Sequence, residues 1–211
     1  MTIVMLDNQD SFVYNLVDVL RDTGDHEMVV YRNTVSADTV LAANPDLIVL
    51  SPGPGYPADT GCMMEVIGRA QGRIPILGIC LGYQALIEHH GGRVSPCGPE
   101  HGTSRPMRLT EAGRASVLFS GLTTGGTPTE PSNSVPVARY HSLGATQEPE
   151  GMRALAWADT EIGEVIMAAE TTDSMAIGLQ FHPESILTPA GPIMLERCVT
   201  QLLQKGANNG K

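Results

Sequence analysis

The sequence predicts an α/β fold: an open, mainly parallel sheet with helices on both faces and antiparallel strands added in its second half. Short apolar runs alternate with helix-like stretches through residues 1–91, and two of these runs are apolar at almost every position. After residue 104, strand-like runs follow one another with few helices between them. Alternation of strand and helix favours parallel pairing, and an unbroken apolar strand is typical of a sheet covered on both faces.

Apolar runs in the first half predict the parallel strands. The run at 47–50 and the run at 74–79 show no polar alternation, so we expect both faces of these strands to be buried. The four predicted strands are residues 2–6, 27–31, 47–50 and 74–79.

Helix-like stretches separate these strands. In the first of them, Leu16, Val19 and Leu20 recur at helical spacing behind Asp10 or Ser11, either of which can cap a helix N-terminus. The second ends before an Asn-Pro pair and the fourth before a Gly-Gly pair, both of which stop helices. The predicted helices cover residues 12–22, 36–43, 62–71 and 81–90.

The second half is predicted to add antiparallel strands and one closing helix. Residues 123–136 are rich in Gly, Pro, Thr and Ser and indicate a surface loop. Residues 206–211 are expected to fray, so we predict one domain over 1–205 and a polar tail over 206–211. The strands are predicted at 105–109, 137–140, 153–158, 164–169 and 176–181, and the helix at 192–204.

Composition excludes several classes of function. The chain has 211 residues and a formal net charge of −10, which argues against binding nucleic acid. Its two lysines, Lys205 and Lys211, lie near the C-terminus, so a lysine-based nucleotide site in the body of the fold is excluded. No apolar run approaches the roughly 20 residues that span a bilayer, and residues 1–7 lack the basic start of a signal peptide. We expect a cytoplasmic protein that binds no membrane.

The cysteines form no C-x-x-C pair and match no zinc pattern, so we expect free thiols and no metal site. Cys62, Cys97 and Cys198 are interpreted as small buried hydrophobic residues. Cys80 differs because it lies in Gly78-Ile79-Cys80-Leu81-Gly82, between a predicted strand and a predicted helix.

The surroundings of Cys80 match the nucleophile-elbow pattern with cysteine in the nucleophile's place. The sharp turn requires small residues two positions before and after the nucleophile, as Gly78 and Gly82 are. A helix N-terminus favours the thiolate. We therefore expect Cys80 to be a nucleophile and the Leu81 N–H to face a developing oxyanion.

Two further segments follow predicted strands, at the sheet edge where α/β proteins bind ligands. In Phe181-His182-Pro183-Glu184, the imidazole and the carboxylate are two residues apart and point to the same side of an extended chain. They can complete a Cys–His–carboxylate triad, although a surface His–Glu pair is an equal alternative.

The second of these segments is Ser51-Pro52-Gly53-Pro54-Gly55. Because proline has no N–H, Gly53 and Gly55 are its free backbone donors, and they can approach a ligand closely. A plain tight turn is the alternative. The loop lacks Gly-Lys-Ser/Thr and is therefore no P-loop.

In this order, PGPG, GICLG, YHSL and HPES resemble a class I (triad-type) glutamine amidotransferase with a flavodoxin-like fold. The resemblance extends over residues 7–187 and is strongest to the glutaminase subunits of anthranilate synthases at residues 7–12, 138–143 and 181–187. It implies that Cys80 is the nucleophile, that His182 is the general base and then acid, and that Glu184 orients His182. Gly53 and Leu81 would supply the N–H groups of the oxyanion hole.

The resemblance also implies a binding site for the amino-acid part of glutamine, formed by Gly55, Gln84, Ser142 and Leu143. Gln84 has independent support, since it follows Cys80 by four residues and shares its helix face. One departure is that Thr103 stands after His101-Gly102, where the family often has lysine. Contacts with a partner subunit can differ there.

The implied reaction is hydrolysis of L-glutamine to glutamate and ammonia, without a cofactor in this chain. Ammonia would pass to a chorismate-binding anthranilate synthase large subunit that holds Mg²⁺, in a heteromer serving tryptophan biosynthesis. The glutaminase subunit of aminodeoxychorismate synthase, which serves folate synthesis, is the alternative. A cysteine peptidase or esterase, and a catalytically silent interaction protein, are the alternatives from other classes.

Overall fold

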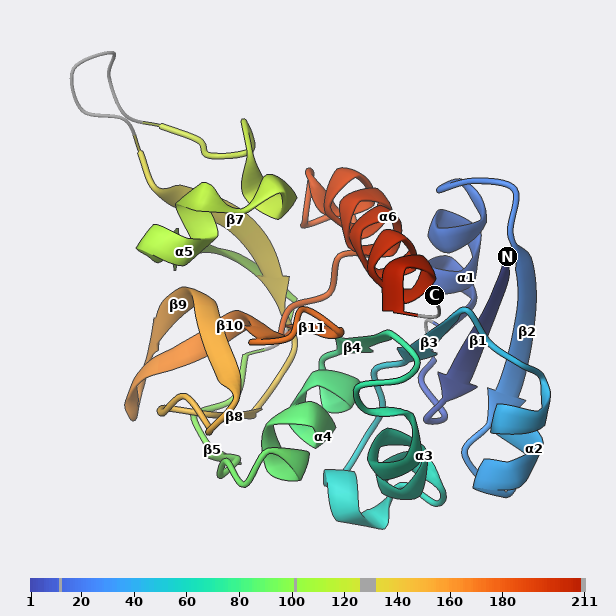
Figure 1. Ribbon diagram of the computed structural model, residues 1–211. Helices are drawn as coiled ribbons and strands as arrows, with labels where there is room; N and C mark the ends of the chain where they lie inside the picture. The colour runs from blue at the N-terminus through green and yellow to red at the C-terminus, as the bar shows by residue number, and fades with distance from the viewer. Residues whose placement is uncertain (12, 101, 126–131, 210–211) are drawn as a thin grey trace.

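A mixed sheet runs through the molecule, with strand order β2-β1-β3-β4-β11-β10-β9-β6-β7 (Figure 1). The structure is a computed structural model that describes residues 1–11, 13–100, 102–125 and 132–209. The first five strands in this order are parallel to one another. They are β2 (Glu27–Arg32), β1 (Thr2–Asp7), β3 (Leu47–Leu50), β4 (Ile76–Ile79) and β11 (Ala176–Leu179).

The remaining strands are antiparallel additions, as the second half of the sequence predicts. A short two-stranded pair lies beside the main sheet. The antiparallel strands are β10 (Gly163–Thr171), β9 (Met152–Thr160), β6 (Thr103–Leu109) and β7 (Ser134–Arg139), and the short pair is β5 (Ser95–Pro96) with β8 (Leu143–Gly144).

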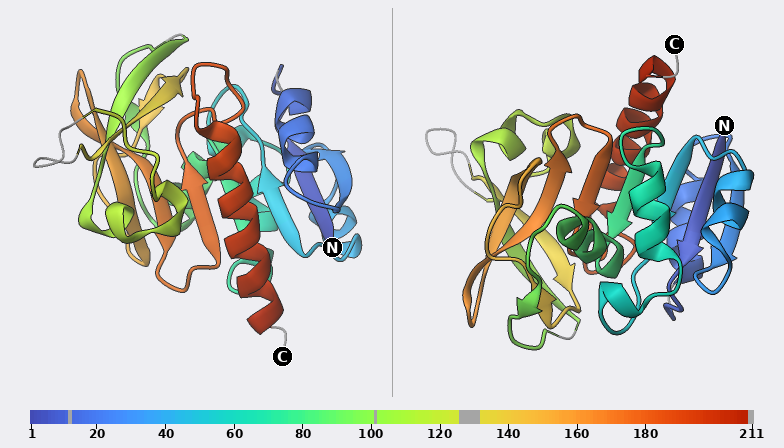
Figure 2. Two further views of the ribbon diagram at one scale, coloured as in Figure 1. Left: turned by 90° about the horizontal axis from the view of Figure 1, so that it is seen from above. Right: turned by 60° about the horizontal axis from the view of Figure 1, so that its bottom comes forward.

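Helices cover both faces of the parallel half, which gives two separate apolar cores (Figures 1 and 2). The red C-terminal helix α6 and the helix α1 pack on one face, and α2, α3 and α4 pack on the other. Strands β3 and β4 are buried at every position, which confirms the expectation from their unbroken apolar runs. The helices are α1 (Val13–Arg21), α2 (Ala37–Ala42), α3 (Met63–Ala70), α4 (Leu81–His89), α5 (Glu111–Ala115) and α6 (Gly191–Asn209), with 3₁₀ turns η1 (Pro57–Asp59) and η2 (Val117–Phe119).

Local side-chain chemistry fixes several helix ends. The Ser36 hydroxyl accepts a hydrogen bond from the Thr39 backbone N–H and caps α2, and Thr110 caps α5 by accepting from the Gly113 N–H. Such caps satisfy backbone donors that have no partner within the helix. The helices α5 and η2, absent from the sequence prediction, are too short to show a periodic apolar pattern.

The C-terminal helix is longer than predicted, and the expectation that residues 206–211 fray is wrong as far as Asn209. Gly206 packs against Pro75 so closely that an added Cβ would lie 2.8 Å from the ring, and the Asn209 amide contacts the Met175 sulfur at 3.0 Å. These tertiary contacts outweigh the weak helix propensity of a Gly- and Asn-rich segment. The predicted 123–136 loop is also too long, because β7 begins at Ser134.

Some sequence predictions fall outside the described residues: Phe12 at the start of the first helix, His101 of the His101-Gly102-Thr103 run, residues 126–131 of the predicted loop, and residues 210–211. Within the described part of the chain, no helix has the combination of length and apolar character that crossing a membrane requires.

Candidate active site

Cys80 lies on a strained turn between β4 and α4. Its backbone has φ 50° and ψ −101°, a conformation that L-residues rarely adopt. The turn is tight enough that a Cβ on Gly82 would lie 2.3 Å from the Leu50 carbonyl oxygen, and one on Gly78 would lie 2.7 Å from the Gly82 backbone. The predicted elbow is therefore present, with the thiol at the N-terminus of α4. Strain of this kind clusters at functional sites.

His182 and Glu184 reach Cys80 from the loop after β11. The His182 Nδ1–H donates to Glu184 Oε1 over 2.6 Å, and His182 lines the same cavity as Cys80 and interacts with its sulfur. Burial by itself lowers the pKa of His182, but the hydrogen bonds and negative charges of Cys80 and Glu184 outweigh burial and raise that pKa to about 11. The arrangement therefore favours the protonated, imidazolium form of His182.

The main chain at His182 is fixed by a second set of contacts. The Thr188 hydroxyl donates to the His182 carbonyl over 2.7 Å and accepts from the Ala138 N–H over 2.8 Å. The His182 N–H donates to the Ala138 carbonyl over 3.2 Å. Tyr140 packs edge-on against the imidazole, with ring centroids 5.0 Å apart. Strand β7 and the residue that follows it thus hold the imidazole in place through both backbone and ring.

The Pro-Gly loop after β3 is held by Asn8. The Asn8 N–H donates to the Ser51 hydroxyl over 2.8 Å, and its side-chain amide donates to the Ser51 carbonyl over 2.9 Å. The side-chain amide of Asn33 donates to the side-chain oxygen of Asn8 over 3.2 Å. Gly53 lies against Asn8 and beside the Leu81 side chain, so the two residues predicted to supply the oxyanion hole are neighbours.

A cavity of about 550 Å³ opens beside Cys80, a volume typical of small-molecule sites. Gln9, Asp10, Ser11 and Asn15 contribute to its wall; the sequence pattern of residues 7–12 indicates the family but no individual site residue. The lining residues are Gln9, Asp10, Ser11, Asn15, Pro52, Gly53, Pro54, Cys80, Tyr140, His182, Glu184, Ser185 and Ile186.

The residues predicted to hold the amino-acid part of glutamine lie outside that lining. Gly55 has φ +84° and open space around it, and Ser142 is exposed. Gln84 and Leu143 do meet, because the Gln84 amide donates to the Leu143 carbonyl over 3.2 Å. Their role in binding substrate stays a prediction.

His141, which has no role in the sequence prediction, also hydrogen-bonds the Leu143 carbonyl oxygen. Its Nδ1–H donates to the Leu143 oxygen over 2.9 Å, while its Nε2 accepts from the Arg139 Nε–H over 3.3 Å. Both side chains are buried. This pattern requires a neutral imidazole, and burial followed by the Arg139 charge lowers the pKa of His141 to about 4.

Stability should therefore fall in mild acid. Between pH 6.5 and about 4 the unfolded chain binds a proton at His141 that the native protein does not, so the free energy of unfolding decreases as pH falls. From pH 7 to pH 5 we expect His141 to account for a loss of about 2 kcal/mol. Urea unfolding at pH 7 and pH 5 measures this loss in the wild type. It should be smaller in His141→Asn, whose amide can still donate to the Leu143 carbonyl. Parallel pH profiles for the two proteins would contradict it.

Among the described residues, no group of three or more His, Cys, Asp or Glu side chains is placed to hold a metal ion. All four cysteines are buried free thiols.

The sequence of residues 4–202 matches the family model "Glutamine amidotransferase class-I". The chain belongs to this family. The amidotransferase is 60% identical to anthranilate synthase component 2 of Corynebacterium glutamicum, over 95% of this chain and 98% of that protein. It is 44% identical to the pyocyanine-specific anthranilate synthase component 2 of Pseudomonas aeruginosa, over 94% and 93% of the two chains.

The amidotransferase also resembles a solved structure. A GMP synthase subunit from Thermoplasma acidophilum matches with a TM-score of 0.76, over 99% of this chain and 94% of that chain, at 21% identity. At this identity the likeness concerns the fold alone, and it confirms the predicted fold class.

Proposed function

We propose that this amidotransferase is the glutaminase component of an anthranilate synthase and hydrolyses L-glutamine to supply ammonia for tryptophan biosynthesis. The observation that carries the proposal is the 60% identity, over nearly the whole of both chains, to anthranilate synthase component 2 of C. glutamicum. Relatives named anthranilate synthase component 2, at 60% and 38% identity, support this role over aminodeoxychorismate synthesis. The buried free thiols agree with a cytoplasmic location.

Catalysis begins at Cys80. The thiolate attacks the side-chain carboxamide carbon of glutamine, and negative charge develops on the carbonyl oxygen. The N–H groups of Gly53 and Leu81 stabilise that oxyanion. The His182 imidazolium donates its proton to the departing nitrogen, which leaves as ammonia, and a thioester remains on Cys80.

Water completes the cycle. His182, now neutral, accepts a proton from the attacking water molecule, the C–S bond breaks, and glutamate leaves. Glu184 keeps the Nδ1 proton of His182 in place, so the Nε2 nitrogen remains free to exchange protons. This chain supplies every group for the hydrolysis, and the Mg²⁺ of the overall reaction is assigned to the synthase component.

Ammonia released into water would be protonated to ammonium, which is not a nucleophile. We therefore place a chorismate-binding synthase component over the mouth of the cavity. At this mouth Ile186 is 93% exposed and Tyr140 is 40% exposed. Exposed apolar side chains at an active-site rim fit a surface that a partner covers.

Replacing Ile186 with aspartate should weaken binding to the synthase component about tenfold or more, because burial of a large aliphatic side chain is lost. Titration by surface plasmon resonance or calorimetry gives the affinity. Ile162→Asp is the matched control, since Ile162 is 45% exposed in the turn between β9 and β10. Equal affinities for the two variants would place the interface elsewhere.

Reconstitution tests the proposed function directly. The chain is purified with the anthranilate synthase large component and, separately, with the aminodeoxychorismate synthase large component, each supplied with chorismate, Mg²⁺ and glutamine. We expect anthranilate from the first mixture at a rate far above that of the large component alone. A product only from the second mixture would support the folate role, and no glutamine-dependent product from either would refute both.

A further inference from the structure

Gln180 contacts the nucleophile directly, although no motif singled it out. Strands β4 and β11 are parallel neighbours in register, with Ile79 opposite Leu179. Cys80 and Gln180, the residues that directly follow these two strands, therefore lie side by side. The Gln180 Nε2 is 3.7 Å from the Cys80 sulfur, within the range of N–H···S hydrogen bonds. Gln180 is fully buried, so water does not compete for this contact.

Neighbouring groups dictate which end of the Gln180 amide faces the sulfur. The Leu143 carbonyl can only accept, so the Gln84 group that contacts it at 3.2 Å must be the NH₂. The same NH₂ donates to the Gln180 side-chain oxygen over 3.2 Å. The Gln180 NH₂ is consequently left to face Cys80.

The chain of contacts extends one step further. His141 donates to the same Leu143 carbonyl, and Arg139 donates to His141. Each donor in this series therefore faces a fixed acceptor. The orientation of the Gln180 amide is set by buried groups rather than by solvent.

We propose that Gln180 donates a hydrogen bond to the Cys80 sulfur, favours the thiolate over the thiol, and holds it in position to attack the substrate. The proton of Cys80 passes to His182, and no other bond changes in this step. Gln84 acts as a positioning residue that keeps the Gln180 amide in the donating orientation. The inference rests on the proposed role of Cys80 as nucleophile.

Other groups near the Cys80 sulfur also affect the acidity of its thiol. His182 contacts Cys80 and is paired with Glu184, and Asp10 and Tyr140 line the adjoining cavity. The N-terminus of α4 also favours negative charge on the sulfur. All of these remain in a variant at position 180, so a change in thiol acidity there reports the Gln180 donor.

The experiment measures the acidity of the Cys80 thiol. Iodoacetamide alkylation is followed from pH 5 to pH 10, and mass spectrometry quantifies the peptide that contains Cys80. In Gln180→Met, which is similar in length but has no N–H, we expect the pH midpoint of alkylation to rise by about one unit, equivalent to a tenfold loss of thiolate preference. In Gln180→Glu the isosteric carboxylate faces the sulfur, and the rise should be larger.

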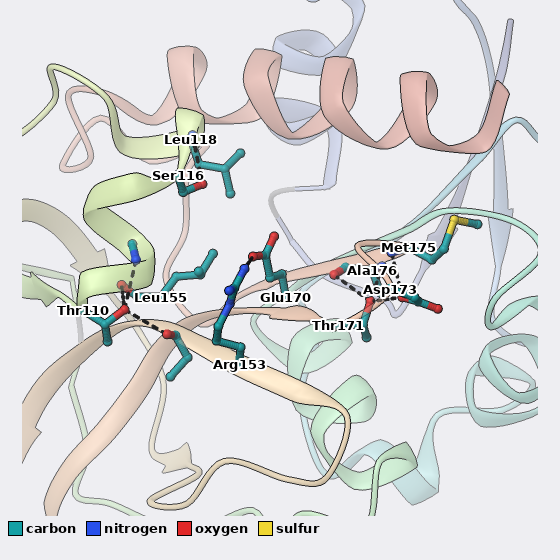
Figure 3. A network of polar contacts seen from close by, with 12 residues as sticks. Thr110, Ser116, Leu118, Arg153, Leu155, Glu170, Thr171, Asp173, Met175 and Ala176 are labelled. Atoms are coloured by element: carbon teal, nitrogen blue, oxygen red, sulfur yellow. Dashed lines mark hydrogen bonds and ion pairs between the residues drawn. The ribbon is translucent and has the colours of Figure 1, made fainter. Parts of the chain in front are cut away.

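Thr171→Val is the matched control. Thr171 is also buried, and its hydroxyl accepts from the Ala176 N–H and donates to Asp173 (Figure 3). Thr171 is the last residue of β10 and contacts Ala176 at the start of β11, whereas Gln180 follows the other end of β11. Loss of the Thr171 hydrogen bonds should therefore lower stability without changing the thiol. We expect its Cys80 midpoint to equal that of the wild type.

Steady-state kinetics of the complex with the synthase component provide a second readout. We expect Gln180→Met to lower the glutamine-dependent kcat about tenfold while ammonia-dependent synthesis stays at the wild-type rate. A folded Gln180→Met protein with an unchanged alkylation midpoint would overturn the inference, and if that variant does not fold, an unchanged midpoint in Gln180→Glu overturns it. A wild-type complex that uses no glutamine would instead refute the proposed function.

Discussion

Replacing Cys80 with alanine is expected to abolish glutamine-dependent anthranilate synthesis, by about 10³-fold or more, because the hydrolysis then has no nucleophile. Cys80 is the thiol at the strained turn, at the N-terminus of α4 and next to His182. The synthase component should still use ammonia added directly at high pH. The measurement is anthranilate formation by the complex with glutamine and, in parallel, with ammonium chloride.

A matched control is Cys62→Ala. Cys62 is equally buried, at 8% exposure, but it precedes α3, and burial raises the pKa of its thiol. This variant should keep glutamine-dependent synthesis. A diazo-ketone analogue of glutamine should label Cys80 and leave Cys62 unmodified. Glutamine use that persists in Cys80→Ala would exclude the proposed mechanism, and loss of both glutamine and ammonia use would point to a structural role.

The parallel half of the fold could be predicted because its signals are local. Leu47–Leu50 is apolar at every position and is found as a strand with those bounds. The end of α6 could not be predicted this way, because Gly206 is held by packing against Pro75, a residue far away in the sequence. Contacts between residues far apart in the sequence do not change the spacing of apolar residues from which a helix is predicted.

In the candidate site, too, the residues with a local sequence signal could be predicted and those defined by tertiary contacts could not. Cys80, His182 and Glu184 could be predicted because each lies in a short motif next to a strand, and the structure brings all three together. Asn8 and Gln180 were missed, although Gln180 is two residues before His182 and therefore points to the same side of an extended chain. Their roles depend on which strands are neighbours in the sheet. That order is a tertiary property.

Among these variants, Gly53→Ala is expected to slow glutamine hydrolysis more than any except Cys80→Ala. A Cβ at this position would lie 2.5 Å from the Asn8 carbonyl oxygen and 2.7 Å from the Asn8 Cβ, closer than real contacts allow. Asn8 cannot move aside easily, because Ser51 and Asn33 hold it through three hydrogen bonds. The Pro-Gly loop must shift instead, and the Gly53 N–H moves away from the oxyanion.

Loss of one donor from an oxyanion hole typically lowers kcat by about 10²–10³-fold, and we expect that range for glutamine hydrolysis by Gly53→Ala. Alkylation of Cys80 should continue at the wild-type rate, since iodoacetamide forms no oxyanion. Gly68→Ala, within α3, is the control. In the part of the chain that the structure describes, a Cβ there would meet only the His89 ring, at an ordinary contact distance of 3.8 Å. A Gly53→Ala enzyme with normal kcat would remove Gly53 from the oxyanion hole, whereas parallel loss of hydrolysis and alkylation would mean that the shifted loop displaces Cys80 itself.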